Sequence, residues 1–238
     1  MSLPKVLIFT ITYSGKDYCL DEFIENTQKF SYDNKEHIFI DNSDDGGKYA
    51  EELKQKLEPL GIKVYHVERG NTSREALARS QNFARKIFLN GNWDYLMSLE
   101  SDIFPKYNVI EALLLHGLDV VTGLYMIGFK EKGTRWPCIT KYAKNPKTGT
   151  YGSRLLRKEE FMDYINKGLK DVAAGGMGCC LMYRSVVEKV PFTYIPGLRP
   201  HSDVFWFNDV RRLGVPVFVD TDVLCDHKNS DWKDVADR

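Results

Sequence analysis

The sequence has 238 residues, of which 43% are hydrophobic and 28% are charged, so it can bury a core of ordinary size. This composition excludes disordered and collagen-like proteins, and the length suits one large or two small domains rather than a repeat array. Lysine and arginine total 33, and aspartate and glutamate also total 33, which gives a net charge of zero. No overall field therefore holds the molecule on DNA or an anionic membrane, and a polyanion must meet a local patch.

Five cysteines are scattered along the chain without a CxxC pair, at positions 19, 138, 179, 180 and 225. An odd, dispersed set argues against both a disulfide framework and a cysteine zinc site. No stretch approaches the roughly 18 apolar residues that a membrane-spanning helix needs. These features predict a cytoplasmic protein without a transmembrane segment.

The first 125 residues alternate short apolar runs with amphipathic segments. Strands are predicted at 5–12, 37–41, 63–67, 95–99 and 119–125, and helices at 20–30, 48–57, 73–89 and 109–116. Within 73–89 the apolar and small residues recur every three or four positions, as in a helix with one buried face. This alternation is typical of a parallel sheet covered by helices, so we predict the α/β class.

Beyond residue 125 the alternation breaks, and glycine, proline and lysine become frequent through residue 158. This composition predicts an irregular excursion from the sheet. Regular structure is predicted to resume with a helix at 158–167, a strand at 177–183, a helix at 203–213 and a strand at 215–219. No internal repeat is visible, so we predict one α/β domain whose second half completes a site begun by the first.

A pair of carboxylates follows the predicted strand at 95–99. In Leu99-Glu100-Ser101-Asp102 the two acids are two residues apart, so they leave the sheet together and can share one cation. Mg²⁺ and Mn²⁺ take carboxylate ligands and bridge diphosphate oxygens. The triplet therefore indicates either a divalent metal site or a solvated turn.

Three further motifs lie in the second half. Cys225-Asp226-His227 closes the last apolar segment with a histidine that is either a metal ligand or a surface residue. The glycine-rich run 175–178 either lets the backbone approach a ligand closely or forms a tight turn. Asp203 lies at a predicted helix start, where a carboxylate either caps the helix or acts as a general base beside an acceptor hydroxyl.

Taken in chain order, these motifs resemble the GT-A nucleotide-sugar glycosyltransferases of the large family-2-like group. The resemblance covers nearly the whole chain. Gly123-Leu124-Tyr125 and the compact length look like virus-encoded members of that group. The segments that carry the resemblance are Thr10-Ile11-Thr12-Tyr13, Ile40-Asp41-Asn42-Ser43, the helix with Arg79 and Asn82, 99–105, 121–125, 175–184, 201–204 and His227.

The resemblance implies a single GT-A, Rossmann-like domain over 1–238, with a mixed, mostly parallel sheet flanked by helices. Residues 1–125 would form the half that binds the nucleotide sugar, and 126–238 the half that binds the acceptor and carries the catalytic base. The implied reaction moves a hexose or pentose from a nucleoside-diphosphate sugar to a hydroxyl acceptor, with Mn²⁺ or Mg²⁺ as cofactor.

The resemblance also implies residue roles. Asp102 and His227 would hold the metal, and Asp203 would be the catalytic base of an inverting reaction. Two positions depart from the family pattern, because Glu100 stands where aspartate is usual and Ser202 stands where inverting members often have an acid. The implied donor-binding residues are Thr10, Thr12, Tyr13, Asp41, Arg79, Asn82, Glu100, Ser101 and Asp102, with Thr12 and Asp41 at the nucleoside and Arg79 near the diphosphate.

The segment 130–158 has nine basic residues and one acid, a local charge of +8 that the overall balance hides. Aromatic residues at 129, 136, 142 and 151 accompany these cations, a combination that holds nucleic acids or sugar polymers. We therefore expect either a glycan acceptor or an anionic one, such as DNA with a hydroxylated base; a solvated loop is the alternative. A non-catalytic sugar- or polyanion-binding module is the second functional class, although the acids at 100, 102 and 203 favour an enzyme.

Overall fold

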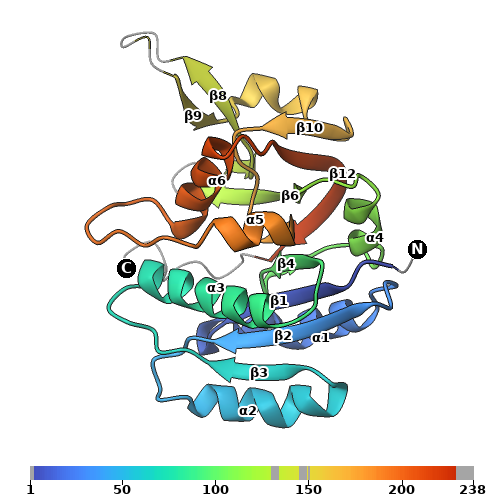
Figure 1. Cartoon of the computed structure of the whole chain (residues 1–238), viewed down its shortest axis with the longest axis vertical. Helices are drawn as coiled ribbons and strands as arrows, with labels where there is room; N and C mark the ends of the chain where they lie inside the picture. The colour runs from blue at the N-terminus through green and yellow to red at the C-terminus, as the bar shows by residue number, and fades with distance from the viewer. Residues whose placement is uncertain (1–2, 130–133, 145–148, 150, 229–238) are drawn as a thin grey trace.

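The computed structural model describes residues 3–129, 134–144, 149 and 151–228, and one large sheet forms its centre (Figure 1). The strand order in the described residues is β10-β12-β6-β11-β4-β1-β2-β3, and four of the seven pairings along this path are parallel. The predicted α/β class with a mixed, mostly parallel sheet is confirmed. The strands are β1 Val6–Thr12, β2 Lys35–Asp41, β3 Lys63–His66, β4 Tyr95–Leu99, β6 Val120–Phe129, β10 Leu169–Val172, β11 Cys179–Tyr183 and β12 Val217–His227.

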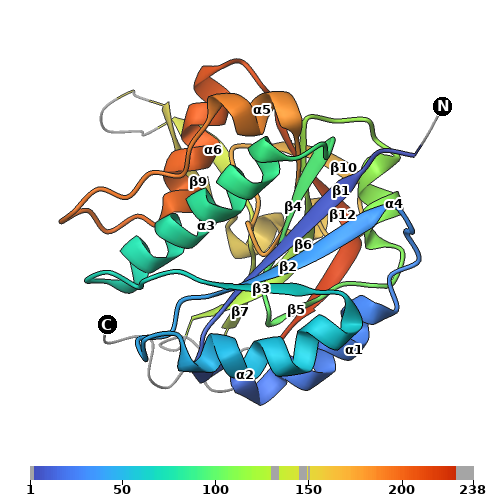
Figure 2. The same cartoon turned by 60° about the horizontal axis from the view of Figure 1, so that its bottom comes forward.

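Helices cover both faces of this sheet (Figure 2). Successive side chains of a strand point to opposite faces, so Val6 and Ile8 of β1 pack with α1, α2 and α4, whereas Leu7 and Phe9 pack with α3, α5 and α6. No helix in the described ranges is long and apolar enough to cross a membrane. The helices are α1 Leu20–Gln28, α2 Lys48–Leu57, α3 Ser73–Asn90, α4 Val109–Leu114, α5 Arg184–Lys189 and α6 Ser202–Arg212.

All nine elements predicted for the first half are confirmed, and their ends differ from the prediction by at most a few residues. The start of α3 shows why the local sequence determines these ends. Thr72 precedes the helix, and its hydroxyl accepts a hydrogen bond from the backbone N–H of Glu75 at 3.1 Å. This side-chain bond satisfies one of the amide groups that a helix N-terminus leaves unpaired.

The second half departs from the predictions in three places. The predicted helix at 158–167 is wrong: a short 3-10 helix, Lys158–Asp163, is followed by Asn166 and Gly168 with positive φ angles, which a helix does not accept. The excursion is less irregular than predicted, because β6 pairs with β7 Thr134–Pro137, and β8 Thr140–Lys144 forms a hairpin with β9 Tyr151–Leu155. The last strand, β12, continues beyond the predicted 215–219 to His227, with a register shift between Asp220 and Leu224.

The end of β12 lies at the same sheet edge as the ends of β1, β2 and β4. This follows because β12 runs parallel to β6, and both β6 and β4 run antiparallel to β11. The short strand β5, Ile103–Phe104, then pairs with β12 and places Ile103 opposite His227. Asp102, one residue before β5, is thereby brought beside His227.

The glycine-rich run 175–178 lets the backbone pack closely against β6. A Cβ added at Gly176 would lie 2.3 Å from Tyr125 Oη, and one added at Gly175 would lie 2.2 Å from Thr122 Oγ1. The backbone N–H of Gly178 also donates to Tyr125 Oη at 3.2 Å. The run thus fixes the buried Tyr125 ring, whose edge-to-face neighbour is His227, with ring centroids 5.5 Å apart.

Replacing Gly176 with alanine should destabilise the fold by about 1–3 kcal/mol, the usual cost of overpacking an interior, because the rigid Tyr125 ring must move. Gly152→Ala is the matched control, since an added Cβ there has no atom within 4 Å. Urea unfolding measures both free energies. Equal losses in the two variants would contradict this account of the glycine-rich run.

Candidate active site

A cluster of charged side chains lies where the loop after β1, the end of β4 and the end of β12 meet. Asp102 is fully buried there. Lys16 comes from η1, the 3-10 helix Ser14–Cys19 that follows β1, and its Nζ donates to Asp102 Oδ2 at 2.8 Å. His227 Nε2 lies 3.6 Å from the same oxygen. The sequence singled out Asp102 and His227 as candidate site residues. The fold brings these two side chains together.

The orientation of the His227 ring is fixed by its second nitrogen. His227 Nδ1 donates to the backbone carbonyl of Met126 at 2.8 Å, because a carbonyl can only accept. In the neutral ring, Nε2 then presents its lone pair on the side of Asp102. An imidazole held in this way by a backbone carbonyl is the usual arrangement of a metal-binding histidine.

Charges within the cluster counteract the effect of burial. Burial alone would raise the pKa of Asp102, but the Lys16 ammonium and His227 in its protonated, imidazolium form hold it at about 2. Asp102 in turn raises the pKa of Lys16 and of His227, although burial acts to lower both. Glu100 differs, because burial dominates and raises its pKa. Asp102 and Lys16 are therefore an ion pair at neutral pH.

Three buried oxygens at this sheet edge make no hydrogen bond within the described residues: Asp102 Oδ1, Thr12 Oγ1 and Ser101 Oγ. Buried polar atoms are nearly always hydrogen-bonded, so each such atom needs an explanation. The three lie at the ends of β1 and β4, where open α/β sheets bind ligands. Among the residues described, no three His, Cys, Asp or Glu side chains are grouped to hold a metal ion.

The residues expected at the nucleoside have different surroundings. Asp41, at the end of β2, accepts from Ser43 Oγ at 2.6 Å and from His66 Nδ1 at 2.8 Å. Tyr13 stacks under the guanidinium of Arg69, which lies 5.5 Å from the ring centroid. Together with Thr12, these residues line the ends of β1 to β3, so the sequence reasoning named most of this edge but missed His66 and Arg69.

Thr10 faces away from this edge toward β2, where its Oγ1 is hydrogen-bonded to His37 Nε2 at 2.9 Å. The rings of Phe23 and Phe39 pack against His37. Burial, with a smaller contribution from the Lys35 ammonium, lowers the pKa of His37 to about 3. Thr10 thus has an internal partner that the sequence did not reveal.

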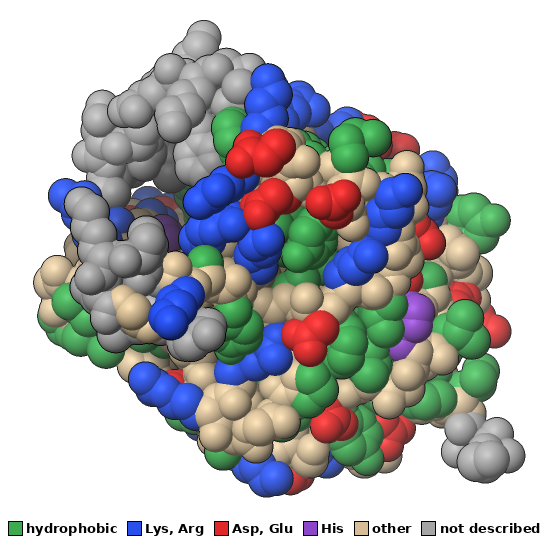
Figure 3. All heavy atoms as spheres, turned by 90° about the horizontal axis from the view of Figure 1, so that it is seen from above, with side chains coloured by type: hydrophobic (Ala, Val, Ile, Leu, Met, Phe, Trp, Pro, Cys, Tyr) green, Lys and Arg blue, Asp and Glu red, His purple; other side chains and the backbone are tan. Residues whose placement is uncertain are grey.

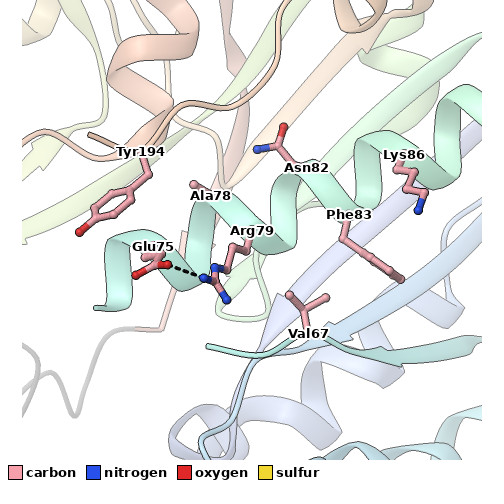
Figure 4. A pocket seen from close by; sticks show the side chains of 8 residues that line it. All are labelled: Val67, Glu75, Ala78, Arg79, Asn82, Phe83, Lys86 and Tyr194. Carbon is pink, nitrogen blue, oxygen red and sulfur yellow. Dashed lines mark ion pairs between the residues drawn. The ribbon is translucent and has the colours of Figure 1, made fainter. Parts of the chain in front are cut away.

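Arg79 and Asn82 line a separate cavity of about 460 Å³ along α3, between Val67 and Tyr194 (Figure 4). Arg79 pairs with Glu75 at 2.6 Å, and Asn82 exchanges two hydrogen bonds with the backbone of Phe192. The other residues around this cavity are Val67, Glu75, Ala78, Phe83, Lys86 and Tyr194. None of the carboxylates of the charged cluster lines it, so the structure does not join these two predicted donor residues to Asp102.

Asp203 lies in the first turn of α6. The residue that caps this helix is His201, without a side-chain bond, and Asp203 Oδ1 instead accepts from the adjacent Val204 N–H at 2.7 Å. Asp203 is therefore not the N-cap residue, contrary to the capping alternative. Burial raises its pKa, and its charge interacts with that of Glu100.

The basic segment is partly neutralised. Glu160, just beyond it, binds Lys141 at 2.6 Å and Arg154 at 2.8 Å. Figure 3 shows lysine and arginine side chains on this face with acidic side chains between them. Lys130, Lys132 and Lys147 lie outside the described residues, so the local charge of +8 overstates what the described hairpin presents.

Comparison with known proteins extends this picture by structure alone. The sequence matches no protein-family model and none of the curated proteins. The chain is nevertheless similar in structure to GalNAc-T7, whose crystal structure contains UDP, GalNAc and Mn²⁺, with a TM-score of 0.63 and 14% sequence identity. The similarity covers 94% of this chain and 44% of that one, so the chain spans less than half of its length. The GT-A fold is thus confirmed; membership of the family-2-like group, viral origin and cytoplasmic location stay predictions.

Stability should depend on His37 below neutral pH. The pKa of His37 is about 3 in the folded chain and near 6.5 when unfolded, so the unfolded state binds one more proton between these values, and stability falls as the pH drops below 6.5. In His37→Gln this extra proton is absent, so the free energy of unfolding should fall less steeply as the pH is lowered. Urea unfolding of both proteins between pH 5 and 7 measures this slope. Parallel curves for the two proteins would contradict this.

Proposed function

We propose that the protein is a metal-dependent glycosyltransferase, which moves a sugar from a nucleoside-diphosphate sugar to a hydroxyl acceptor. The observation that carries this proposal is the meeting of Asp102 and His227, from opposite halves of the chain, at the ligand-binding edge of a GT-A sheet. The unbonded Asp102 Oδ1 and the fixed His227 ring support it, within the described residues. GalNAc-T7, which has a similar fold, was crystallised with UDP and Mn²⁺.

The chemistry of the residues fits a divalent cation. Asp102 would give a carboxylate oxygen and His227 an imidazole nitrogen, both suited to Mn²⁺. Such ions often have only one or two protein carboxylates and complete their coordination with substrate phosphates and water. When bound, the ion would neutralise the negative charge that develops on the departing nucleoside diphosphate.

The donor would lie along the ends of β1, β2 and β4. We assign Thr12, Tyr13 and Asp41 to the nucleoside, and Glu100 and Ser101 to the ribose and diphosphate. Thr10 and Asn82 are left out of this assignment because their side chains already bond to His37 and to the Phe192 backbone. Asp41 also accepts bonds from Ser43 and His66, but it is kept because a carboxylate has about four acceptor positions. Arg79 would reach the donor only by leaving Glu75, to which it is paired in the described structure.

Asp203 is the proposed general base of an inverting transfer. Its carboxylate would take the proton of the acceptor hydroxyl as the sugar carbon is attacked, while Asp102 stays on the leaving-group side. A raised pKa, caused here by burial, brings a carboxylate closer to the operating pH and makes it a better base. The two acids come from different elements, β4–β5 and α6, as two separate tasks require.

A glycan hydroxyl is the proposed acceptor. GalNAc-T7 was crystallised with GalNAc, and Glu160 neutralises two cations of the hairpin that an anionic acceptor would need. The decisive experiment incubates the protein with a panel of UDP-, GDP- and TDP-sugars and Mn²⁺, and measures released nucleoside diphosphate. Neutral glycans, phosphorylated glycans and DNA with hydroxylated bases serve as acceptors. Mn²⁺-dependent release supports the proposal, whereas binding without release supports a non-catalytic module.

Asp102→Asn should abolish the Mn²⁺-dependent part of nucleoside diphosphate binding, because the amide has no negative charge for the ion. Asp226→Asn is the matched control, since it lies next to His227 but its side chain is exposed. Calorimetry with and without EDTA measures the difference. Unchanged Mn²⁺-dependent affinity in Asp102→Asn would overturn the assignment of the metal site.

Asp203→Asn should keep donor affinity but lower turnover by roughly 10²–10⁴-fold, the range typical for loss of a general base. Asp209→Asn, on the same helix and paired only with Arg212 in the described residues, controls for effects on α6. Donor titration and initial rates separate binding from chemistry. A variant that loses donor affinity or fails to fold would contradict the assigned role. Unchanged turnover of the bound donor would contradict it as well.

A further inference from the structure

Lys16 makes a direct ion pair with the Asp102 carboxylate, and no part of the proposed reaction has yet used it. Its Nζ donates to Asp102 Oδ2, the oxygen that also faces His227 Nε2. Because His227 Nε2 lies 3.6 Å from Oδ2, a divalent ion held by both residues would take this oxygen and not Oδ1 alone, which makes no hydrogen bond within the described residues. Lys16 and the ion therefore compete for one carboxylate.

We propose that Lys16 is the resident counter-cation of the donor site: it neutralises Asp102 in the donor-free protein, yields that carboxylate to the divalent ion, and then pairs with the diphosphate of the donor. This inference rests on the proposed function, and it adds a leaving-group residue to it. No covalent bond is made or broken in the exchange: the Lys16–Asp102 ion pair would be replaced by coordination of Asp102 to the ion and by an ion pair between Lys16 and the diphosphate.

The charges of the cluster favour such an exchange. Glu100 and Asp102 both interact with the Lys16 ammonium. In the donor-free protein Lys16 is therefore held by these carboxylates and cannot meet a diphosphate. A divalent ion bound at Asp102 adds positive charge there, so that Lys16, released from Asp102, becomes available to an anion.

The local structure permits the movement. Lys16 lies in the short 3-10 helix Ser14–Cys19, and its side chain is 19% exposed, whereas Asp102 is fully enclosed. A lysine ammonium on a four-carbon stem can turn without displacing the backbone, which Lys16 anchors through its N–H to the carbonyl of Tyr13 at 2.8 Å. Solvent thus reaches the Lys16 side chain and not the Asp102 carboxylate.

The first test uses the metal alone. Mn²⁺ is titrated into donor-free protein, and free Mn²⁺ is followed by electron paramagnetic resonance. Lys16→Met should bind Mn²⁺ about tenfold more tightly than the wild type, because the unit charge that competes at close range has gone. Lys16→Arg retains that charge and is the matched control, with wild-type affinity. Weaker or unchanged Mn²⁺ binding in Lys16→Met would overturn the proposal.

The second test uses UDP, GDP and TDP at saturating Mn²⁺. Lys16→Met should bind the preferred diphosphate about tenfold more weakly, since a charge-assisted bond to phosphate is lost, although it binds Mn²⁺ more tightly. These opposite changes are the signature of the exchange, because simple damage to the site weakens both ligands. Weakening of both in a folded Lys16→Met variant would refute the exchange.

Two controls keep the result interpretable. Thermal unfolding with and without Mn²⁺ shows whether Lys16→Met folds, and the double variant Lys16→Met/Asp102→Asn should lose the gain in Mn²⁺ affinity, because both gain and loss act through one carboxylate. If the wild type binds no nucleoside diphosphate, the proposed glycosyltransferase fails, while the titration with Mn²⁺ alone still decides whether Lys16 competes for Asp102. Retained Mn²⁺ gain in the double variant would contradict the competition.

Discussion

The buried carboxylate of Asp102 is the constraint around which the site is arranged. An ionised carboxylate removed from water is unstable unless cations and hydrogen-bond donors surround it. The fold brings these from distant parts of the chain: Lys16, 86 residues away, and His227, from the last strand. Met126 holds the imidazole in place. The buried charge of Asp102 therefore links three parts of the chain: the 3-10 helix after β1, the turn after β4 and the end of β12.

This coupling explains why neither half of the chain can form the site alone. The first half supplies β1, β2 and β4, whose ends align because they run parallel. The second half returns through β11 and β6, so that β12 ends at the same edge and pairs with β5. A ligand bound between Asp102 and His227 would contact both halves, and it should stabilise the domain as a whole because it binds only the folded chain.

Prediction from the sequence succeeded where short-range patterns determine the structure. It failed where contacts between distant parts of the chain determine the structure. The positions of Asp102 and His227 at this sheet edge were predictable because Asp102 closely follows one apolar strand and His227 ends another. Lys16 was missed because it lies in a short loop with no periodic pattern. The bonds that occupy Thr10 and Asn82 depend on the β1–β2 register and on the segment after α5. The prediction of a helix at 158–167 was wrong because it gave too little weight to Asn166 and to Gly168 just beyond it, both of which adopt positive φ angles.

The central claim is that Asp102 and His227 together hold the cation that binds the donor diphosphate. The most direct measurement is an anomalous-difference map from a crystal of the protein grown with Mn²⁺ and the nucleoside diphosphate that it binds. The account predicts one Mn²⁺ peak coordinated by an Asp102 oxygen, His227 Nε2 and the diphosphate. A diphosphate bound at the sheet edge without Mn²⁺, or an ion held by other residues, would contradict it.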